Sequence, residues 1–112
     1  MIVIGDTTLE LRDARKADEN YIRSTFARSA WDLVRKVRRE HWYQTSTPLL
    51  ERLLAGAAVT VACAPEDNDA LFGWAAATDG VLWYVYVPFE FRGLGLAREL
   101  VRKVQGNATE TG

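Results

Sequence analysis

The sequence predicts a single α+β domain in which helices flank a mixed sheet, with the element order β-α-α-β-β-β-α. Two kinds of pattern carry this prediction. Alternating or uniformly apolar stretches with turn residues between them indicate strands, and apolar residues that recur every three or four positions indicate helices. The chain has 112 residues, of which 48% are hydrophobic and 26% charged, enough for one hydrophobic core. We therefore expect residues 1–112 to form one domain.

The first half of the chain predicts one strand followed by two helices. Residues 7–13 alternate in character, which is typical of a half-buried strand. A helix with one apolar face is expected from about 18 to 37, with Asp18 as its N-cap. Thr47 followed by Pro48 predicts the start of a second helix, since threonine caps free amides and proline suits the first helical position.

The second half predicts an antiparallel meander. Residues 59–64 and 71–78 are apolar and are separated by a polar, turn-prone segment, which is typical of a β-hairpin. Asp79 and Gly80 predict the next turn, so a third strand is expected directly afterwards at 81–87. This strand is apolar on both faces, as expected where both faces are covered.

The last helix is expected at about 94–105, because apolar residues recur along one of its faces. Leu96, Leu100, Val101 and Val104 form this face, and charged residues occupy the opposite one. From Gly106 onward the sequence is polar and small, so we expect a frayed end.

The composition argues against several classes of protein. The 14 Lys and Arg residues balance 15 Asp and Glu residues, so the formal charge of −1 does not draw the chain toward nucleic acid or an anionic membrane. The single cysteine, Cys63, lies in an apolar run, which predicts a buried strand residue rather than a disulfide, a metal ligand or a nucleophile. Neither a signal peptide nor a long apolar segment is evident. We expect a cytoplasmic protein with no metal and no membrane partner.

Residues 86–97 contain the most informative motif, a strand that runs into a glycine-containing turn and then into an amphipathic helix. Arg92, Gly95 and Ala97 form the pattern Arg-x-x-Gly-x-Ala. Small residues let backbone N–H groups approach a bound anion closely, and the positive end of the following helix dipole points to the same place. The motif predicts a phosphate or pyrophosphate site. Its alternative interpretation is a tight turn that only permits strand-to-helix packing.

The stretch from Leu82 to Leu100 resembles the acetyl-coenzyme A binding segment of the Gcn5-related N-acetyltransferases, whose signature is Arg or Gln, two residues of any kind, Gly, one residue, and Gly or Ala. The predicted order of elements is also similar, over about residues 7–106 and most closely from about residue 71. The resemblance implies the acyltransferase fold, acetyl-CoA as the acetyl donor, and a small-molecule or peptide amine as the acceptor.

The resemblance also assigns residues that bind acetyl-CoA. Backbone groups around Tyr86 and Val87 would pair with the pantetheine arm and polarise the acetyl carbonyl. The Arg92 guanidinium would add a charge-assisted contact. The amides that would hold the pyrophosphate belong to Gly93, Leu94, Gly95, Leu96 and Ala97.

Three side chains are candidates for catalysis, and each has a structural alternative. Glu90 lies beside the turn and would relay a proton through water, or it is an exposed surface residue. Tyr84 shares a strand face with Tyr86 and would line the acceptor cleft, or it packs in the core. His41 titrates near neutrality and follows the first helix, where the family often borders its substrate site, or it has a structural role. The sequence offers no convincing nucleophile, so direct transfer is expected.

The sequence departs from the family after its last predicted helix. A further strand, a helix and a closing pair of strands normally follow, and without them the strand at 81–87 would expose an open edge. Three explanations are open: a shortened sequence, a dimer in which a second chain completes the sheet, or a reduced relative that no longer performs chemistry. We predict self-association, as a dimer that pairs through this edge. One alternative to an enzyme is a non-catalytic module of the same fold that binds a protein partner. The third interpretation is a nucleic-acid binder that uses residues 35–43, where basic side chains precede Trp42 and Tyr43.

Overall fold

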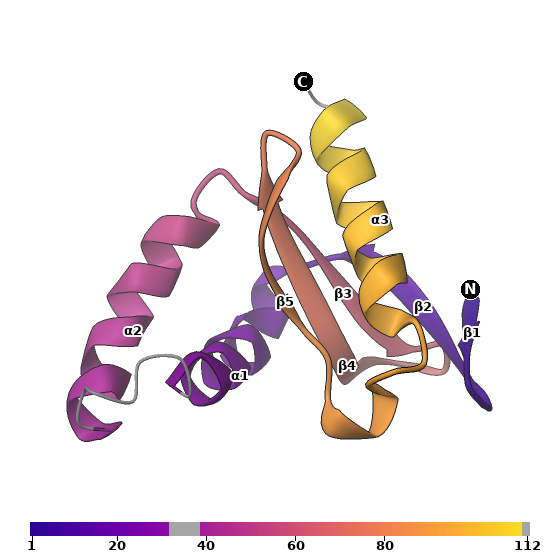
Figure 1. The fold of residues 1–112 in the computed structure, drawn as a ribbon, viewed down its shortest axis with the longest axis horizontal. Coiled ribbons are helices and arrows are strands. Elements are labelled where there is room, and N and C mark those ends of the chain that lie inside the picture. The colour runs from indigo at the N-terminus through magenta and orange to yellow at the C-terminus, as the bar shows by residue number, and fades with distance from the viewer. Residues whose placement is uncertain (32–38, 111–112) are drawn as a thin grey trace.

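The computed structural model of the chain describes residues 1–31 and 39–110. In this part of the chain, one antiparallel sheet has helices on both faces, with its strands in the order β1-β2-β3-β4-β5 (Figure 1). The strands are β1 (Ile2–Ile4), β2 (Thr7–Asp13), β3 (Ala58–Ala64), β4 (Asp67–Thr78) and β5 (Val81–Tyr86). The helices are α1 (Glu19–Trp31), α2 (Arg39–Leu54) and α3 (Leu96–Glu110), and two 3₁₀ turns are η1 (Lys16–Asp18) and η2 (Phe89–Phe91).

The predicted α+β class and the central meander are confirmed. Strands β2, β3 and β5 follow the predicted boundaries closely, although every strand pair in the described residues is antiparallel rather than mixed. Asp79 and Gly80 form the turn between β4 and β5, with left-handed φ angles of 53° and 80°. Strand β4 begins earlier than predicted because Asp67 pairs with Ala64 of β3 across a tight turn. Strand pairing therefore extends β4 into residues 67–69, although their polar composition predicted a turn.

The predicted start of the second helix is wrong. Thr47 and Pro48 lie well inside α2, which begins at Arg39. An interior proline lacks the N–H that would bond to the preceding turn, which ordinarily weakens a helix. Contacts between α2 and α1 offset this weakening of the helix. Trp42 of α2 is buried, and its Nε1–H donates to the Ala27 carbonyl of α1 at 2.8 Å.

Both ends of the described chain carry more regular structure than predicted. Residues Ile2–Ile4 form β1, a short strand that pairs with β2. At the other end, α3 continues through Gly106 to Glu110 instead of fraying. The predicted continuation of the first helix from Trp31 to residue 37 lies outside the described residues.

The two faces of the sheet bury two separate hydrophobic clusters. Alternate residues of β4 point to opposite faces, so Ala75 and Ala77 join the cluster under α3, whereas Trp74 and Ala76 join the one under α1 and α2. Figure 1 shows α1 and α2 on one side of the strands and α3 on the other. Cys63 is fully buried in β3, as predicted.

The buried side chain of Asp18 links the start of α1 to strand β2 through hydrogen bonds with Arg12. Asp18 immediately precedes α1, but its carboxylate accepts from residues before it rather than capping the first helical amides. Two guanidinium nitrogens of Arg12 in β2 donate to it at 2.7 and 3.0 Å, and the Arg15 N–H donates at 2.9 Å. Burial by itself raises the pKa of the Asp18 carboxyl, but these hydrogen bonds and the charge of Arg12 outweigh burial and lower that pKa.

The substitution Asp18→Asn is expected to lower the free energy of unfolding by about 2 to 4 kcal/mol at pH 7, because it leaves Arg12 without its buried partner. Since the folded-state pKa of Asp18 is lowered, its contribution is present above about pH 4 and is lost as the pH falls through the folded-state pKa. Urea denaturation between pH 2 and 7 measures both effects. The control Asp69→Asn, which removes an exposed ion pair with Arg15, should cost less than about 1 kcal/mol. Equal losses from the two variants would contradict the prediction.

Candidate functional site

The turn between β5 and α3 is open, and two of its residues have backbone conformations that favour glycine. Gly93 has a φ of +79° and Gly95 a φ of +96°. A Cβ built on either residue would meet no atom within 4 Å. The turn therefore combines a left-handed backbone with free space beside it, and no neighbouring side chain fills that space.

The amides of the turn are not used by the backbone hydrogen bonds around it. The Phe91 N–H donates to the Pro88 carbonyl at 3.0 Å, and the Arg92 N–H donates to the Phe89 carbonyl at 3.2 Å. Further along, the N–H of Glu99 donates to Gly95 at 3.3 Å. Within the described residues, none of the loop hydrogen bonds uses an amide between 93 and 97. The first amides of α3 also have no intrahelical partner, and amides in this arrangement are suited to an anion. We call residues 93–97 the amide cradle.

Arg92 directly precedes the amide cradle and contacts the end of β5. Its side chain is exposed, its Nε donates to the Val87 carbonyl at 3.0 Å, and its guanidinium carbon lies 5.9 Å from the centre of the Phe89 ring. The hydrogen bond engages one of the backbone groups predicted to pair with pantetheine. The terminal nitrogens of Arg92 have no acceptor among the described residues, so they are free to meet a phosphate.

Strand β5 has one edge that is unpaired within the described residues, and it carries a β-bulge. Ala77 pairs with Leu82 and Ala76 with Tyr84, so Trp83 is an extra residue on β5. Trp83 and Tyr84 consequently both pack toward the cluster under α1 and α2. Bulges re-aim side chains and are frequent beside active sites.

The backbone of β5 presents alternate residues to its open edge. The Tyr86 carbonyl lies on the β4 side, where a Cβ on Gly73 would approach its oxygen to 2.9 Å. Successive backbone groups of a strand alternate in direction, so Val85 and Val87 direct theirs toward the open edge. Of the two residues predicted to pair with pantetheine, Val87 therefore directs its backbone groups to the open edge and Tyr86 directs its carbonyl to β4.

Tyr84 and Tyr86 share one face of β5, as predicted, but their surroundings differ. Tyr84 is stacked on Trp74 with ring centres 5.2 Å apart and meets Phe26 edge-on at 5.0 Å. Its hydroxyl is hydrogen-bonded to Ser29 of α1. Tyr84 therefore packs in the core, which is the structural alternative given above. Its hydrogen bond to Ser29 links β5 to α1.

Tyr86 lies beside a residue that the sequence did not single out, Tyr21 of α1. The Tyr21 and Tyr86 rings meet edge-on with centres 6.4 Å apart. Burial raises the pKa of the Tyr21 hydroxyl, with further upward contributions from Tyr86 and Glu90 and an opposing one from Arg28. Glu90 itself is exposed on η2. No periodicity or motif sets Tyr21 apart on the predicted helix, so sequence reasoning could not find it.

The remaining predictions concern α2. His41 lies on α2, and its side chain lies outside the described part of the structure. Trp42 is only 8% exposed and donates to Ala27, so it is not available to stack on a base as the nucleic-acid interpretation requires. Of the basic residues in 35–43, those up to 38 lie outside the described residues. No described helix is long and apolar enough to span a membrane.

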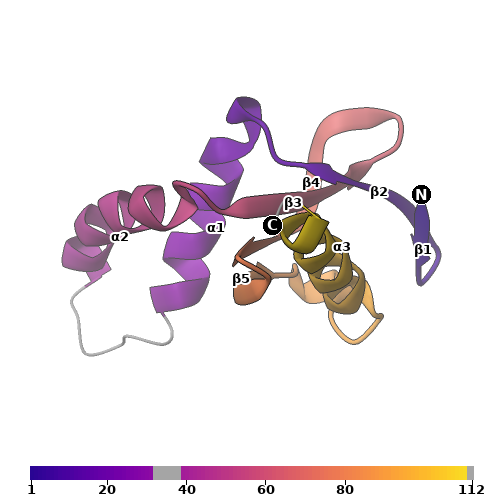
Figure 2. The same cartoon turned by 90° about the horizontal axis from the view of Figure 1, so that it is seen from above.

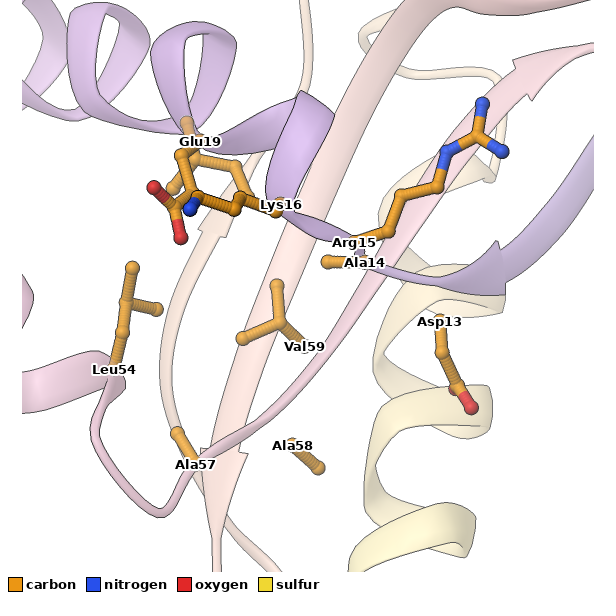
Figure 3. Close-up of a pocket in the computed structure, with 10 residues that line it drawn as sticks. Asp13, Ala14, Arg15, Lys16, Glu19, Leu54, Ala57, Ala58 and Val59 are labelled. Atoms are coloured by element: carbon orange, nitrogen blue, oxygen red, sulfur yellow. The ribbon is translucent and has the colours of Figure 1, made fainter.

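Two hollows lie at opposite ends of the sheet. One, of about 520 Å³, is bounded by Lys16 and Glu19 on one side and Leu54 and Ala57 on the other (Figure 3). It lies where β3 begins, at the end of the sheet away from the amide cradle, so it is separate from the predicted cofactor site. The other, of about 400 Å³, lies beside the cradle and includes Gly95 in its wall.

Comparison with known proteins gives matches in structure but not in sequence. No model of a protein family matches the chain, and no curated protein matches it. A candidate acetyl transferase from Pyrococcus furiosus is 21% identical, with a TM-score of 0.66 over 94% of this chain and 77% of that one. A GCN5-related N-acetyltransferase from Rhodopseudomonas palustris is 18% identical, with a TM-score of 0.66 over 100% of this chain and 71% of that one.

A third similar structure contains a coenzyme A derivative. It is the aminoglycoside N-acetyltransferase AAC(6')-Iy in complex with the bisubstrate analogue CoA-S-monomethyl-acetylneamine, 19% identical, with a TM-score of 0.59 over 95% of this chain and 75% of that one. The chain therefore has the fold of the Gcn5-related N-acetyltransferases, as its sequence predicted.

Proposed function

We propose that this chain binds acetyl-CoA and transfers the acetyl group directly to an amine. The observation that carries the proposal is the amide cradle, whose glycines are open and whose N–H groups are unused by the surrounding loop bonds. A pyrophosphate matches this combination of amides and helix start. The structural neighbour solved with a CoA-containing analogue supports the same donor.

The open edge of β5 provides the second half of the donor site. Pantetheine carries amide groups, and Val85 and Val87 direct backbone groups to that edge, so we propose that they pair with it as an added strand would. Since Arg92 engages the Val87 carbonyl, the Val87 N–H and the groups of Val85 remain for this pairing. The acetyl group would then lie beside the bulge at Trp83.

The aromatic face of β5 provides the acceptor side. Acetyl-CoA supplies the acetyl group as a thioester. The amine must lose a proton as its nitrogen bonds to the acetyl carbon and the carbon–sulfur bond breaks. We propose Glu90 as the group that accepts this proton through water, with Tyr86 and Tyr21 lining the approach. Tyr84 positions α1 through Ser29, and an assisting role for His41 remains a prediction.

The substitution Gly95→Trp tests the donor site. An indole in the free space at Gly95 should block the amide cradle and weaken coenzyme A binding at least about 10-fold in isothermal titration, a change of about 1.4 kcal/mol. Gly106→Trp is the matched control, because a Cβ there also meets open space but lies far along α3. Circular dichroism confirms that both variants fold. Equal affinity in the wild type and Gly95→Trp would reject the cradle as the pyrophosphate site.

The substitution Glu90→Gln tests the proton acceptor. It should lower kcat by about 10²-fold or more while leaving coenzyme A affinity unchanged, because it removes a base but no donor contact. Free thiol release from acetyl-CoA can be followed with kanamycin, a short alanyl peptide and lysine as acceptors; neighbours of this fold include an aminoglycoside and a ribosomal-protein-alanine N-acetyltransferase. Glu66→Gln, at another exposed glutamate, should retain activity. Full activity of Glu90→Gln would remove Glu90 from the mechanism.

We also propose that the start of the open β5 edge, at Val81 and away from Val85 and Val87, mediates self-association, which is the feature that a non-catalytic module of this fold would use. Val81, at the start of β5, is 67% exposed, and Val3, on the strand at the other edge of the sheet, is 71% exposed. A lysine on an edge strand opposes pairing with another chain.

The matched substitutions Val81→Lys and Val3→Lys distinguish the two edges. Light scattering at micromolar concentration should show a dimer that Val81→Lys weakens at least about 10-fold and Val3→Lys leaves intact. A monomeric wild type, or a dimer lost only in Val3→Lys, would rule out the β5 interface. A β5-dependent dimer without coenzyme A affinity would instead favour the non-catalytic module.

A further inference from the structure

The hollow of about 520 Å³ lies between the start of α1, the end of α2 and the start of β3, and the proposed acetyl transfer makes no use of it. Its volume is within the range of about 300–1,000 Å³ that is typical of small-molecule sites. Figure 2 shows α1 and α2 together on the side of the sheet away from α3, so the hollow lies away from the amide cradle. We call this space the Lys16 hollow.

The floor of the Lys16 hollow is apolar and preformed. Ala14 and Ala57 are small and leave the space open, and Leu54 and Val59 are only half-buried beside it. Backbone hydrogen bonds fix both walls, because the Ala14 N–H donates to the Val59 carbonyl at 2.9 Å and the Ala57 N–H donates to the Leu54 carbonyl at 3.1 Å. A ligand that covers this floor would gain from the burial of apolar area.

Two charged side chains that line the Lys16 hollow, Lys16 and Glu19, are exposed and form no ion pair or side-chain hydrogen bond within the described residues. Figure 3 shows that they extend to the same side of the hollow. The other two charged residues, Asp13 and Arg15, lie at its other end. Both of these already have interactions, that of Arg15 being with Asp69 at 3.4 Å. Lys16 and Glu19 are therefore the charges available to a ligand.

A smaller hollow of about 340 Å³ continues the Lys16 hollow between α1 and α2. Glu19 and Leu54 line both spaces. The other charged residues of the smaller hollow, Arg23 and Glu51, pair with each other at 3.4 Å. The smaller hollow thus adds room beside Glu19 without adding an unpaired charge.

These charges and the apolar floor together match an α-amino acid with a large apolar side chain. A purely anionic amphiphile would meet Glu19, and a purely cationic one would meet Lys16, so each would face a side chain of its own charge. An amino acid carries an ammonium and a carboxylate on one carbon. This arrangement suits two side chains of opposite charge that are three residues apart on the same side of the chain.

We propose that the Lys16 hollow binds a free α-amino acid with a large apolar side chain. Lys16 contacts the carboxylate, Glu19 contacts the ammonium, and Leu54 and Val59 pack against the side chain. This inference does not rest on the proposed function, because it uses none of the residues assigned to acetyl transfer.

NMR titration of the ¹⁵N-labelled protein with L-phenylalanine tests the inference. Amide signals of residues 14–19 and 57–59 should shift and those of 93–97 should not, with millimolar affinity because the ligand is small and the site is open. N-acetylphenylalanine and phenylalaninamide each lack one of the two charges, and glycine lacks the side chain. Each should bind at least about 5-fold more weakly. Equal affinity for all four ligands, or shifts confined to 93–97, would overturn the inference.

Two substitutions assign the charges separately. Glu19→Gln should weaken phenylalanine binding at least about 5-fold and leave N-acetylphenylalanine unchanged, because that ligand has no ammonium. Lys16→Gln should weaken phenylalanine equally and leave phenylalaninamide, which has no carboxylate, unchanged. Glu66→Gln and Lys103→Gln change the same kinds of side chain outside the hollow and should bind as the wild type does. Wild-type affinity in both hollow variants would overturn the proposal. Circular dichroism confirms that all four variants fold.

Titration in the presence of coenzyme A separates this inference from the proposed function. Saturating coenzyme A should leave the phenylalanine-induced shifts at residues 14–19 and 57–59 in place, because the Lys16 hollow lies away from the amide cradle. Displacement of phenylalanine by coenzyme A would overturn the inference. A protein that binds phenylalanine at these residues but has no affinity for coenzyme A would support the inference and contradict the proposed function alone.

Discussion

The close packing of α3 on the sheet is the constraint on which the candidate site depends. Leu96, Leu100 and Val104 are fully buried against a β4 face whose residues are small, which lets the helix approach the strands. Gly73 is the point where three elements meet, since a Cβ there would lie 2.9 Å from the Tyr86 carbonyl and 3.3 Å from Leu100 Cδ1. Because this contact fixes the first turn of α3, the amides before it are held in a defined place relative to β5. The packing of the core therefore holds the candidate site in a defined position.

Strand β5 separates the two halves of the proposed chemistry. One of its faces packs with α3, next to the amide cradle, and its other face carries the aromatic residues that meet α1. The bulge at Trp83 turns consecutive side chains toward the α1 face while the open edge stays available. A donor along the edge and an amine on the aromatic face would therefore approach each other across the strand. This arrangement is compatible with direct transfer, in which the two substrates must be held together.

The features that were predicted correctly are those that depend on residues close together in the sequence. Periodicity placed the meander and α3, and the spacing of Arg92, Gly95 and Ala97 placed the turn, because glycine conformations and amphipathic faces depend on near neighbours. The failures involve contacts between distant segments. Pro48 predicted a helix start, but α2 begins earlier, where the buried Trp42 contacts α1. The direction of the Tyr86 carbonyl depends on its pairing with β4, which the sequence of β5 alone does not encode. The hollow of about 400 Å³ beside the amide cradle could not be predicted either, since it forms only where β1 meets the start of α3.

The position of β1 has a practical consequence for handling the protein. Met1 is 83% exposed and directly precedes β1, whose residues Ile2, Val3 and Ile4 line the hollow of about 400 Å³ beside the amide cradle. An affinity tag or fusion partner attached at the amino end would emerge beside this hollow, close to Gly95 of the cradle, and, if rich in histidine, would alter the local charge. Purification through a carboxyl-terminal tag, or removal of an amino-terminal one, would keep ligand measurements free of that interference.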